Sequence, residues 1–273
     1  MWLNVPMPSF KISYSNENLK ADAETLAAKL GLGLQGSSGD EKVLPKADYL
    51  LTFKPSGLCL ESTQQGGHGP IRCDFDSGII THRRKYGGGN GQSIAKAVGI
   101  SGKFMPHVLD LTAGMGSDGF VLAGLGCRLT LLERNSIVYS LLYDGLQRAS
   151  LAGMGDSGLA EVVARIDLLE ADSLTYLQSL ESAQLPDVIY IDPMFPARKK
   201  SAKVKKEMQV FHGIVGADED AAELLVLALQ RAKYRVVVKR SAAAGHLGEM
   251  APSYSREGKT TRFDVYALHR LPS

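Results

Sequence analysis

The sequence has few cysteines and no long apolar run. Its 273 residues include only three cysteines, Cys59, Cys73 and Cys127, which lie far apart. This number and spacing exclude a disulfide-stapled secreted scaffold and offer no paired zinc-ligand motif, so we expect reduced thiols and no metal. No window approaches 18 consecutive apolar residues, and the N-terminus lacks a basic segment followed by an apolar one. We therefore expect a soluble cytoplasmic protein without a membrane partner.

Internal repeats, low-complexity tracts and a large net charge are also absent. The net charge is +2, and the 44% hydrophobic content is ample for a core. The positive charge is concentrated in two basic clusters, at 82–85 and 198–206. Such clusters on a near-neutral chain indicate local phosphate sites, although two solvated lysine-rich faces are the alternative. The candidate phosphate-binding residues are Arg83, Arg84, Lys85, Arg198, Lys199, Lys200, Lys203, Lys205 and Lys206.

Strands and helices are predicted to alternate from Pro106 onward, which is typical of a parallel sheet covered by helices. The predicted strands are 107–111, 128–133, 165–169, 187–191 and 234–239, and the predicted helices are 117–125, 136–151 and 218–233. These strands are apolar runs, as expected for strands buried on both faces. Residues 262–267 alternate polar and apolar, which predicts an antiparallel strand with a more exposed face.

The N-terminal part of the sequence does not show this alternation of strands and helices. Short apolar segments at 49–53, 58–61 and 71–75 are separated by Gly, Pro and Ser, and a helix is predicted near 18–30. We expect a small N-terminal α/β subdomain over 1–80 and a Rossmann-like α/β domain over 106–273. A basic and glycine-rich connection with a short helix at 92–98 would join them over 81–105.

A glycine-rich loop, Asp110 to Gly119, lies between the first strand and the first helix of the large domain. Its glycines let the backbone pass close to a ligand. Glu133, at the end of the next strand, is placed to accept hydrogen bonds from a ribose diol. The two features predict an adenosine-binding site. They do not distinguish its ligand, because Gly114, Gly116 and Gly119 also satisfy the dinucleotide fingerprint.

Three observations favour S-adenosylmethionine over NAD. Asp110 stands four positions before Gly114, where its carboxylate can order the loop near the methionine amino group. Asp172 and Ser173 follow the third strand and offer polar groups to an adenine amine. The fourth strand ends in Asp192-Pro193-Met194-Phe195-Pro196, for which a dehydrogenase has no use. We therefore expect S-adenosylmethionine as the cofactor.

The segment that begins at Asp192 suits methyl transfer to an exocyclic amine of a nucleobase. The lone pair of such an amine is delocalised into the ring, so the enzyme must aim it. The Asp192 side chain and the Pro193 carbonyl can accept its two N–H groups, and Phe195 offers a flat face for the base. The segment resembles the [DN]-P-P-[FYW] motif of amino-group methyltransferases, with Met194 in place of the second proline.

Each of these residues also has a simpler interpretation. Asp192 alone could cap a turn, and Phe195 alone could be a core aromatic. Their position at the carboxyl end of a central strand favours the catalytic interpretation, because ligands bind there in open α/β sheets. The following stretch, 197–217, is long for a connection and carries the second basic cluster. We expect it to contact phosphates around the target base.

A set of motifs resembles one known family. The set comprises His82-Arg83-Arg84-Lys85-Tyr86-Gly87-Gly88-Gly89, Ala95-Lys96-Ala97-Val98-Gly99, Thr112-Ala113-Gly114-Met115-Gly116, Leu132-Glu133-Arg134-Asn135, the Asp192 segment, Lys205-Lys206-Glu207-Met208 and Val236-Val237-Val238-Lys239-Arg240. From about residue 75 onward the chain closely resembles the ribosomal RNA small subunit methyltransferase J family. The resemblance implies a Rossmann-like class I S-adenosylmethionine-dependent methyltransferase fold. It also implies N2-methylation of a guanine near the 3′ end of 16S rRNA, with 16S rRNA or the small ribosomal subunit as partner.

The resemblance also implies which residues contact the cofactor. They are Ser117, Asp118, Glu133, Arg134, Asp172, Ser173 and Asp192, in addition to Asp110, Gly114 and Gly116 of the loop. Ser117 stands where some members have arginine, so we expect it to contribute its backbone. The family places Asp192 beside the cofactor, whereas the amine chemistry places it beside the base, and a residue at this strand end can serve both. For 82–91 we hypothesise phosphate binding, with a flexible linker as the alternative.

Three other functions remain compatible with the sequence. They are methylation of another base amine in RNA or DNA, a non-catalytic role in RNA binding and assembly, and methylation of a small molecule. Asp192, Phe195 and the glycine loop argue against a non-catalytic protein, and the basic loop argues against a small-molecule substrate. No residue discriminates guanine from adenine, and the sequence does not indicate the oligomeric state.

Overall fold

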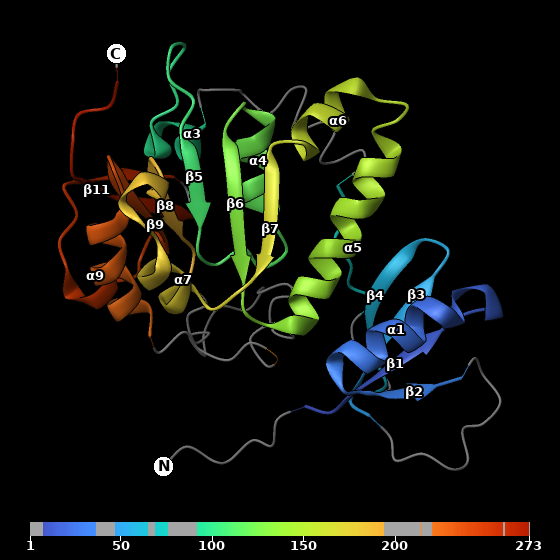
Figure 1. The fold of residues 1–273 in the computed structure, drawn as a ribbon. Helices are drawn as coiled ribbons and strands as arrows, with labels where there is room; N and C mark the ends of the chain where they lie inside the picture. The colour runs from blue at the N-terminus through green and yellow to red at the C-terminus, as the bar shows by residue number, and fades with distance from the viewer. Residues whose placement is uncertain are drawn as a thin grey trace, which may run out of the picture. The chain divides into compact units, whose positions relative to one another are not determined.

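A computed structural model describes residues 8–36, 47–64, 69–75, 92–193, 214, 220–258 and 260–272 (Figure 1). The chain divides into two compact units. The first comprises Met1–Cys73, Ser140–Gly145 and Met194–Ala217, and the second comprises Asp74–Tyr139, Leu146–Pro193 and Asp218–Ser273. None of the helices in the described ranges has the length and apolarity that a membrane crossing requires.

The first unit contains a four-stranded sheet in the order β2-β1-β3-β4. Its strands are β1 (Phe10–Tyr14), β2 (Gly33–Gln35), β3 (Tyr49–Lys54) and β4 (Gly57–Ser62). Strand β1 is parallel to β2 and β3, while β3 and β4 are antiparallel. A short 3-10 helix (Glu17–Leu19) leads into α1 (Lys20–Leu30), which ends at a left-handed Gly31. The predicted helix and the two predicted strands at 49–53 and 58–61 are therefore present.

Two N-terminal features differ from the prediction. Strands β1 and β2 were not predicted, although Phe10, Ile12 and Tyr14 alternate with polar residues as a strand should. The predicted strand at 71–75 is wrong, because only Ile71 forms a bridge, to Leu60. The apolar residues of this segment, Cys73 and Phe75, are buried by packing and take no part in a strand ladder.

The second unit is built on a seven-stranded sheet in the order β10-β11-β9-β8-β5-β6-β7. The strands are β5 (His107–Asp110), β6 (Arg128–Glu133), β7 (Ile166–Glu170), β8 (Val188–Ile191), β9 (Arg235–Ser241), β10 (Tyr254–Glu257) and β11 (Thr261–Ala267). Strands β5 to β9 are parallel, and β11 is antiparallel to both β9 and β10. The parallel sheet and its antiparallel strand at 262–267 confirm the predicted fold. The more exposed face predicted for this strand is wrong, because the polar residues Arg262 and Asp264 are buried between β9 and β10, where they bind each other.

Burial follows position in this sheet. All four residues of the central strand β8 are buried, as an apolar run in the middle of a parallel sheet should be. The same expectation is wrong for β7, which has no buried residue because it is an edge strand. The other edge strand, β10, was not predicted. Its four residues are all exposed, so its sequence carries no apolar pattern.

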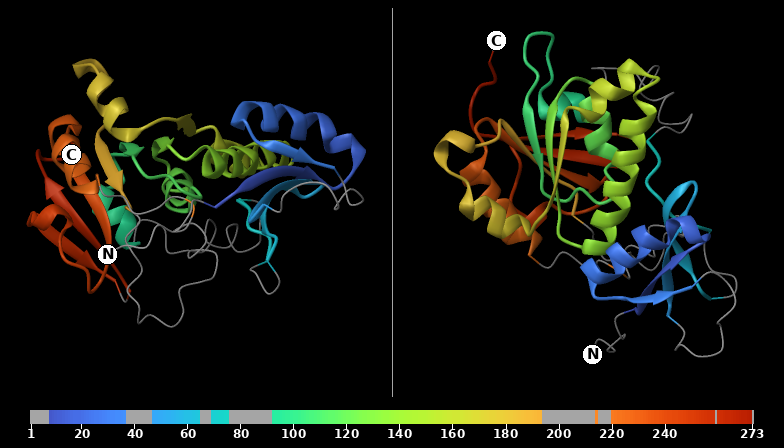
Figure 2. Two further views of the ribbon diagram at one scale, coloured as in Figure 1. Left: turned by 90° about the horizontal axis from the view of Figure 1, so that it is seen from below. Right: turned by 45° about the vertical axis from the view of Figure 1, so that its right-hand side comes forward.

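Helices cover both faces of the seven-stranded sheet. The helices described from residue 92 onward are α3 (Ser93–Val98), α4 (Ser117–Gly124), α5 (Ser136–Ala152), α6 (Ser157–Val163), α7 (Ser173–Ser179) and α9 (Ala221–Arg231), with short 3-10 helices at Ser182–Gln184 and Leu247–Glu249. Residues Ser140–Gly145 of α5 belong to the first unit. Figure 2 shows α3 and α4 on one face and α7 and α9 on the other. The predicted helices near 92–98, 117–125 and 136–151 are present, and the last begins at Ala221, with 218 and 219 outside the described residues.

The strand order reverses beside β5. From β5 the chain runs outward through β6 and β7, and then returns to add β8 and β9 on the opposite side. In open α/β sheets the carboxyl ends of the two strands at such a reversal border the ligand crevice. Here these strands are β5, which ends at Asp110, and β8, which is followed by Asp192.

Candidate active site

The loop after β5 has the backbone conformation of a ligand-binding turn. Gly114 and Gly116 have φ angles of 53° and 70°, a region that residues with a side chain rarely adopt. A Cβ atom at Gly114 would come only within 3.9 Å of the Thr112 carbonyl oxygen, so the space beside this glycine is open. Gly119 has a different role, because its Cβ would lie 2.7 Å from a methyl group of Leu131 on β6. It allows α4 to pack closely on the sheet.

Glu133, the last residue of β6, holds this loop in place. Its two carboxylate oxygens accept hydrogen bonds from the backbone N–H groups of Gly114, at 2.9 Å, and Asn135, at 2.8 Å. The side chain is 7% exposed. The sequence predicts Glu133 as a ribose ligand, and the structure adds an ordering role for the glycine loop. The two roles are compatible, since each carboxylate oxygen can accept more than one hydrogen bond.

Asp110 supports the loop from the end of β5. It is 3% exposed, and its Oδ1 accepts hydrogen bonds from the N–H group of Thr112, at 2.9 Å, and from the Thr112 hydroxyl, at 3.4 Å. Burial raises the pKa of Asp110 to about 7, and the negative charges of Asp118 and Asp192 act in the same direction. The Thr112 hydroxyl in turn accepts the backbone N–H of Asp192 at 2.7 Å. The ends of β5 and β8 are thus joined through Thr112.

The start of α7 contributes the predicted pair Asp172 and Ser173. Asp172 caps this helix by accepting the N–H and the hydroxyl of Thr175, each at 2.9 Å, and the backbone hydrogen bond from Thr175 lowers its pKa. The Ser173 hydroxyl donates to the Leu111 carbonyl oxygen at 2.6 Å and is buried. Ser173 therefore ties α7 to the glycine loop, which places Asp172 beside that loop.

A lysine joins two of the predicted aspartates. The Lys239 ammonium, on β9, lies 2.7 Å from Oδ2 of Asp118 and 2.8 Å from Oδ2 of Asp192. The same oxygen of Asp118 accepts the Tyr190 hydroxyl at 2.7 Å. The carboxylates of Asp192 and Asp118 raise the pKa of Lys239 and outweigh its burial, so the ammonium stays charged.

Sequence reasoning did not assign Lys239, Tyr190 or Thr112 to the site. The sequence does contain an indication for Lys239, because a charged residue at the end of an apolar run that is predicted to be a central strand is unusual. Tyr190 carried none, because an aromatic residue in a buried strand is expected in the core. Only the strand order brings both to Asp118.

The remaining predicted residues are distributed as follows. Ser117 is the first residue of α4, and Pro193 is buried directly after Asp192. The Arg134 guanidinium forms a 2.6 Å ion pair with Asp220, at the start of α9. Phe195, the arginines Arg83, Arg84 and Arg198, and the lysines of both basic clusters lie outside the described residues.

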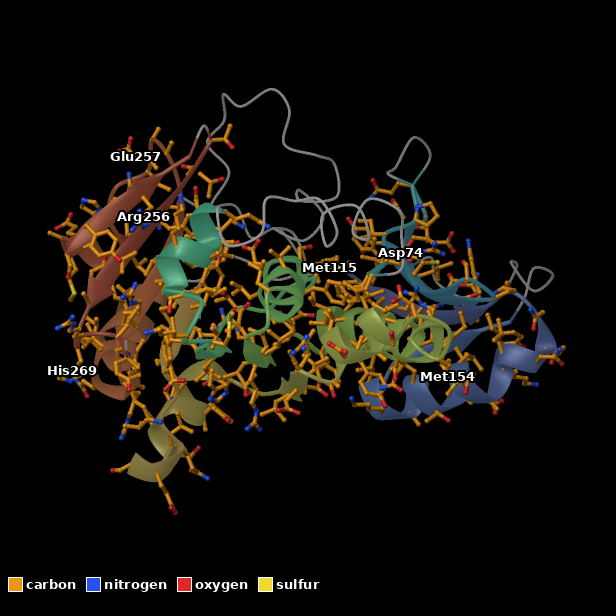
Figure 3. All side chains as sticks on the ribbon, turned by 90° about the horizontal axis from the view of Figure 1, so that it is seen from above. Asp74, Met115, Met154, Arg256, Glu257 and His269 are labelled. Atoms are coloured by element: carbon orange, nitrogen blue, oxygen red, sulfur yellow. The ribbon has the colours of Figure 1, made fainter. Side chains whose placement is uncertain are left out.

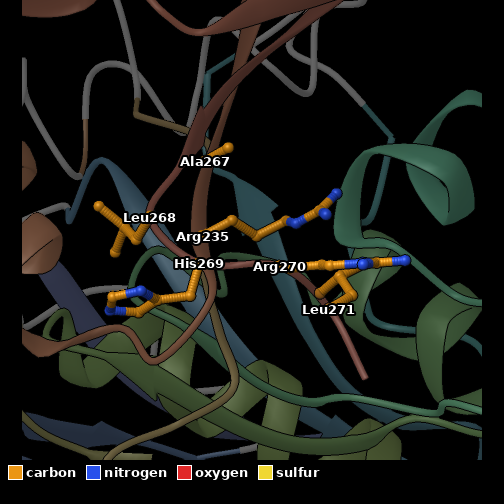
Figure 4. A pocket seen from close by; sticks show the side chains of 6 residues that line it. All are labelled: Arg235, Ala267, Leu268, His269, Arg270 and Leu271. Carbon is orange, nitrogen blue, oxygen red and sulfur yellow. The ribbon is translucent and has the colours of Figure 1, made fainter. Parts of the chain in front are cut away.

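A separate depression lies at the other end of β9 (Figure 4). Arg235, the first residue of that strand, lines it together with His269 and Arg270, whereas Lys239 stands near the end of the strand. The Arg235 guanidinium donates at 3.1 Å to the Ala97 carbonyl oxygen, at the last turn of α3. Figure 3 shows His269 well apart from Met115 of the glycine loop. This depression is thus distinct from the aspartate cluster.

The cluster suits a cationic, adenosine-containing ligand. Asp118 and Asp192 both contact Lys239, the single lysine among the described residues of the cluster, and Asp110 is a third carboxyl group nearby, so the net charge favours a cation. The open glycine loop and Glu133 fit an adenosine with its ribose. Where side chains are described, no three His, Cys, Asp or Glu residues are arranged to hold a metal ion.

This fold and this site define a Rossmann-like methyltransferase that uses S-adenosylmethionine. Residues 40–268 match the family described as "Putative SAM-dependent methyltransferase". Among curated proteins, the chain is 50% identical to "Ribosomal RNA small subunit methyltransferase J" of Cellvibrio japonicus, over 92% of this chain and 94% of that protein. It is 47% identical to the protein of the same name from Marinobacter nauticus, over 92% of this chain and 88% of that one. The chain belongs to the ribosomal RNA small subunit methyltransferase J family, as its motifs predicted.

A solved structure agrees with this assignment. It is that of an S-adenosylmethionine-dependent methyltransferase from Neisseria gonorrhoeae, which is 35% identical to this chain. The match has a TM-score of 0.68 and covers 94% of this chain and 95% of the other.

Proposed function

We propose that the protein methylates the exocyclic N2 amine of one guanine in small-subunit rRNA, near the 3′ end of 16S rRNA. The observation that carries this proposal is the position of Asp192. Its backbone N–H donates to the hydroxyl of Thr112, in the glycine loop, at 2.7 Å. Asp192 is the residue that directly follows the central strand β8. A base amine brought to Asp192 would therefore lie next to the cofactor loop. The names of the relatives support small-subunit rRNA as the substrate.

The reaction requires that the amine is oriented toward the methyl group and then loses a proton. S-adenosylmethionine supplies an electrophilic methyl group when bound. The Asp192 carboxylate and the Pro193 carbonyl oxygen would accept the two amine N–H groups and turn the nitrogen lone pair out of conjugation with the ring and toward the methyl group. Methylation leaves the nitrogen with a positive charge and one proton too many. The neighbouring carboxylate stabilises that charge and accepts the proton.

The predicted cofactor residues fall on the same edge of the sheet. Glu133 would bind the ribose, Asp172 the adenine amine, and Asp110 with Asp118 the methionine end. Ser117, Gly114 and Gly116 would contribute backbone. Ser173 and Arg134 would act indirectly, since Ser173 holds the loop and Arg134 pairs with Asp220.

The RNA would be held by the two basic clusters, with Phe195 stacked on the target base. We expect that Arg83→Ala/Arg84→Ala weakens RNA binding and lowers its salt slope by about 0.7 per lost phosphate contact with a single strand. A matched control is Lys20→Ala/Lys103→Ala, which removes two positive charges that lie outside the two basic clusters in the sequence. Unchanged affinity and slope in the arginine variant would indicate that 82–91 serves only as a linker.

A labelled-cofactor assay tests the proposed reaction. The protein is incubated with 16S rRNA that lacks the modification, either naked or assembled into small subunits, and the RNA is digested to nucleosides. We expect label only in N2-methylguanosine. Label in another nucleoside, or in DNA, would contradict the proposed substrate, and the comparison of the two RNA forms identifies which is used. An rRNA substrate would also place the protein in the cytoplasm.

A further inference from the structure

The side chain of Lys239 makes two short contacts to residues from different parts of the site. Its ammonium lies 2.7 Å from Asp118, in the first turn of α4, and 2.8 Å from Asp192, directly after β8. Both contacts go to an Oδ2 atom, and an ammonium has three donors for such bonds. Lys239 therefore connects the cofactor loop to the segment proposed to receive the base.

The contacts counter a repulsion between carboxylates. Asp118 and Asp192 each place an oxygen within 2.8 Å of the same nitrogen, so the two negative charges lie close together. Asp110 adds a third carboxyl group, and the Tyr190 hydroxyl donates to Asp118. Without a cation between them, the mutual repulsion of these carboxylates would be uncompensated.

From this geometry we infer that Lys239 is a positioning residue, which keeps Asp192 ionised and oriented toward the target amine while Asp118 serves the cofactor. The inference rests on the proposed function of Asp192. Lys239 does not act as the proton acceptor, because the two aspartates raise its pKa and keep the ammonium protonated. Lys239 contributes a fixed positive charge between the first turn of α4, which carries Asp118, and Asp192, which follows β8.

The role of the charge can be separated from that of the side-chain volume. Lys239→Met retains an unbranched chain and removes the ammonium. We expect kcat to fall about 10- to 100-fold, because a misplaced catalytic group costs rates of this order. We also expect the acidic limb of the kcat–pH profile to move to higher pH, because Asp192 then takes up a proton more readily. Lys239→Arg keeps the charge, so its acidic limb should stay at the wild-type position even if kcat falls.

The matched control is Lys233→Met, just before β9, where the ammonium lies 3.9 Å from Asp187 and is half-exposed. It should leave kcat and the pH profile unchanged. A Lys239→Met variant with the wild-type kcat and pH profile would overturn the inference. So would an acidic limb that moves equally in Lys239→Met and Lys239→Arg. If Lys239→Met does not fold, as judged by thermal unfolding, Lys239→Gln takes its place with the same expected results.

The experiment distinguishes this inference from the proposed function. Each variant is compared with the wild type by total methyl transfer to the RNA, whichever nucleoside carries the label. Methylation of a base amine other than guanine N2 would contradict the proposed substrate and leave the Lys239 comparison intact. Normal N2-methylation by Lys239→Met would contradict only the role of Lys239.

Discussion

The Glu133 carboxylate accepts the backbone N–H of Gly114 at 2.9 Å, and this hydrogen bond joins the end of β6 to the glycine loop after β5. The second oxygen of Glu133 binds the N–H of Asn135. The residue predicted to bind the ribose therefore also sets the conformation of the backbone beside the cofactor.

Glu133→Gln is expected to weaken both loop order and cofactor binding. The amide replaces one acceptor oxygen with a donor, which then faces a backbone N–H. A buried group left without its partner costs about 1–3 kcal/mol, so the free energy of unfolding should fall by this amount. Isothermal titration should show a higher Kd for S-adenosylmethionine. Glu161→Gln, at an exposed helical position, is the control. An unchanged Kd would show that Glu133 is neither a ligand nor an organiser of the loop.

Gly114→Ala tests the left-handed backbone of the loop. The φ angle of 53° is strained for any residue with a side chain, at about 1–2 kcal/mol. The added methyl group would also project into the open space assigned to the cofactor. We expect a lower melting temperature and a larger loss of cofactor affinity than of stability. Gly102→Ala, where a Cβ meets no atom within 4 Å, should change stability by less than about 0.5 kcal/mol.

Stability should depend on pH through Asp110. Burial raises its pKa in the folded protein from 3.8 to about 7, so the folded state binds a proton that the unfolded state releases. The stabilisation is complete below about pH 3.8 and is lost as the pH rises through 7. Urea unfolding without cofactor should therefore show that the wild type loses stability between pH 4 and 7 relative to Asp110→Asn. Asp167→Asn, on the exposed strand β7, should behave like the wild type, and identical pH profiles for all three proteins would contradict this prediction.

Asp192→Ala is expected to separate catalysis from cofactor binding. Removal of the carboxylate takes away the acceptor for the amine proton, and the loss of such a group lowers kcat by about 100-fold or more. The Kd for S-adenosylmethionine should rise much less, because Glu133, Asp110 and the glycine loop remain. Steady-state methyl transfer gives kcat, and isothermal titration gives the Kd. A kcat close to that of the wild type would exclude Asp192 from the reaction, and Asp167→Ala is the control.

Much of the second unit could be predicted from local patterns. The apolar run of β8 predicted a central buried strand, and the alternating residues of β11 predicted an antiparallel one. The patterns failed at the edges, since β7 has no buried residue and all four residues of β10 are exposed. A strand is buried on both faces when it lies inside the sheet, with a paired strand on each side. The sequence of a strand does not show which strands will pair with it.

The sequence alone determined the family, the cofactor class and the residues at the ends of β5, β6 and β8. These properties depend on short motifs, such as the glycine loop and Asp192-Pro193, whose chemistry is local. Only the tertiary structure decided that Lys239 bridges Asp118 and Asp192, which precede it by 121 and 47 residues. Parallel strands bring their carboxyl ends to one edge of the sheet, and the strand order then selects which side chains meet there. For this reason the spacing of residues in the sequence does not predict the two ion pairs of Lys239.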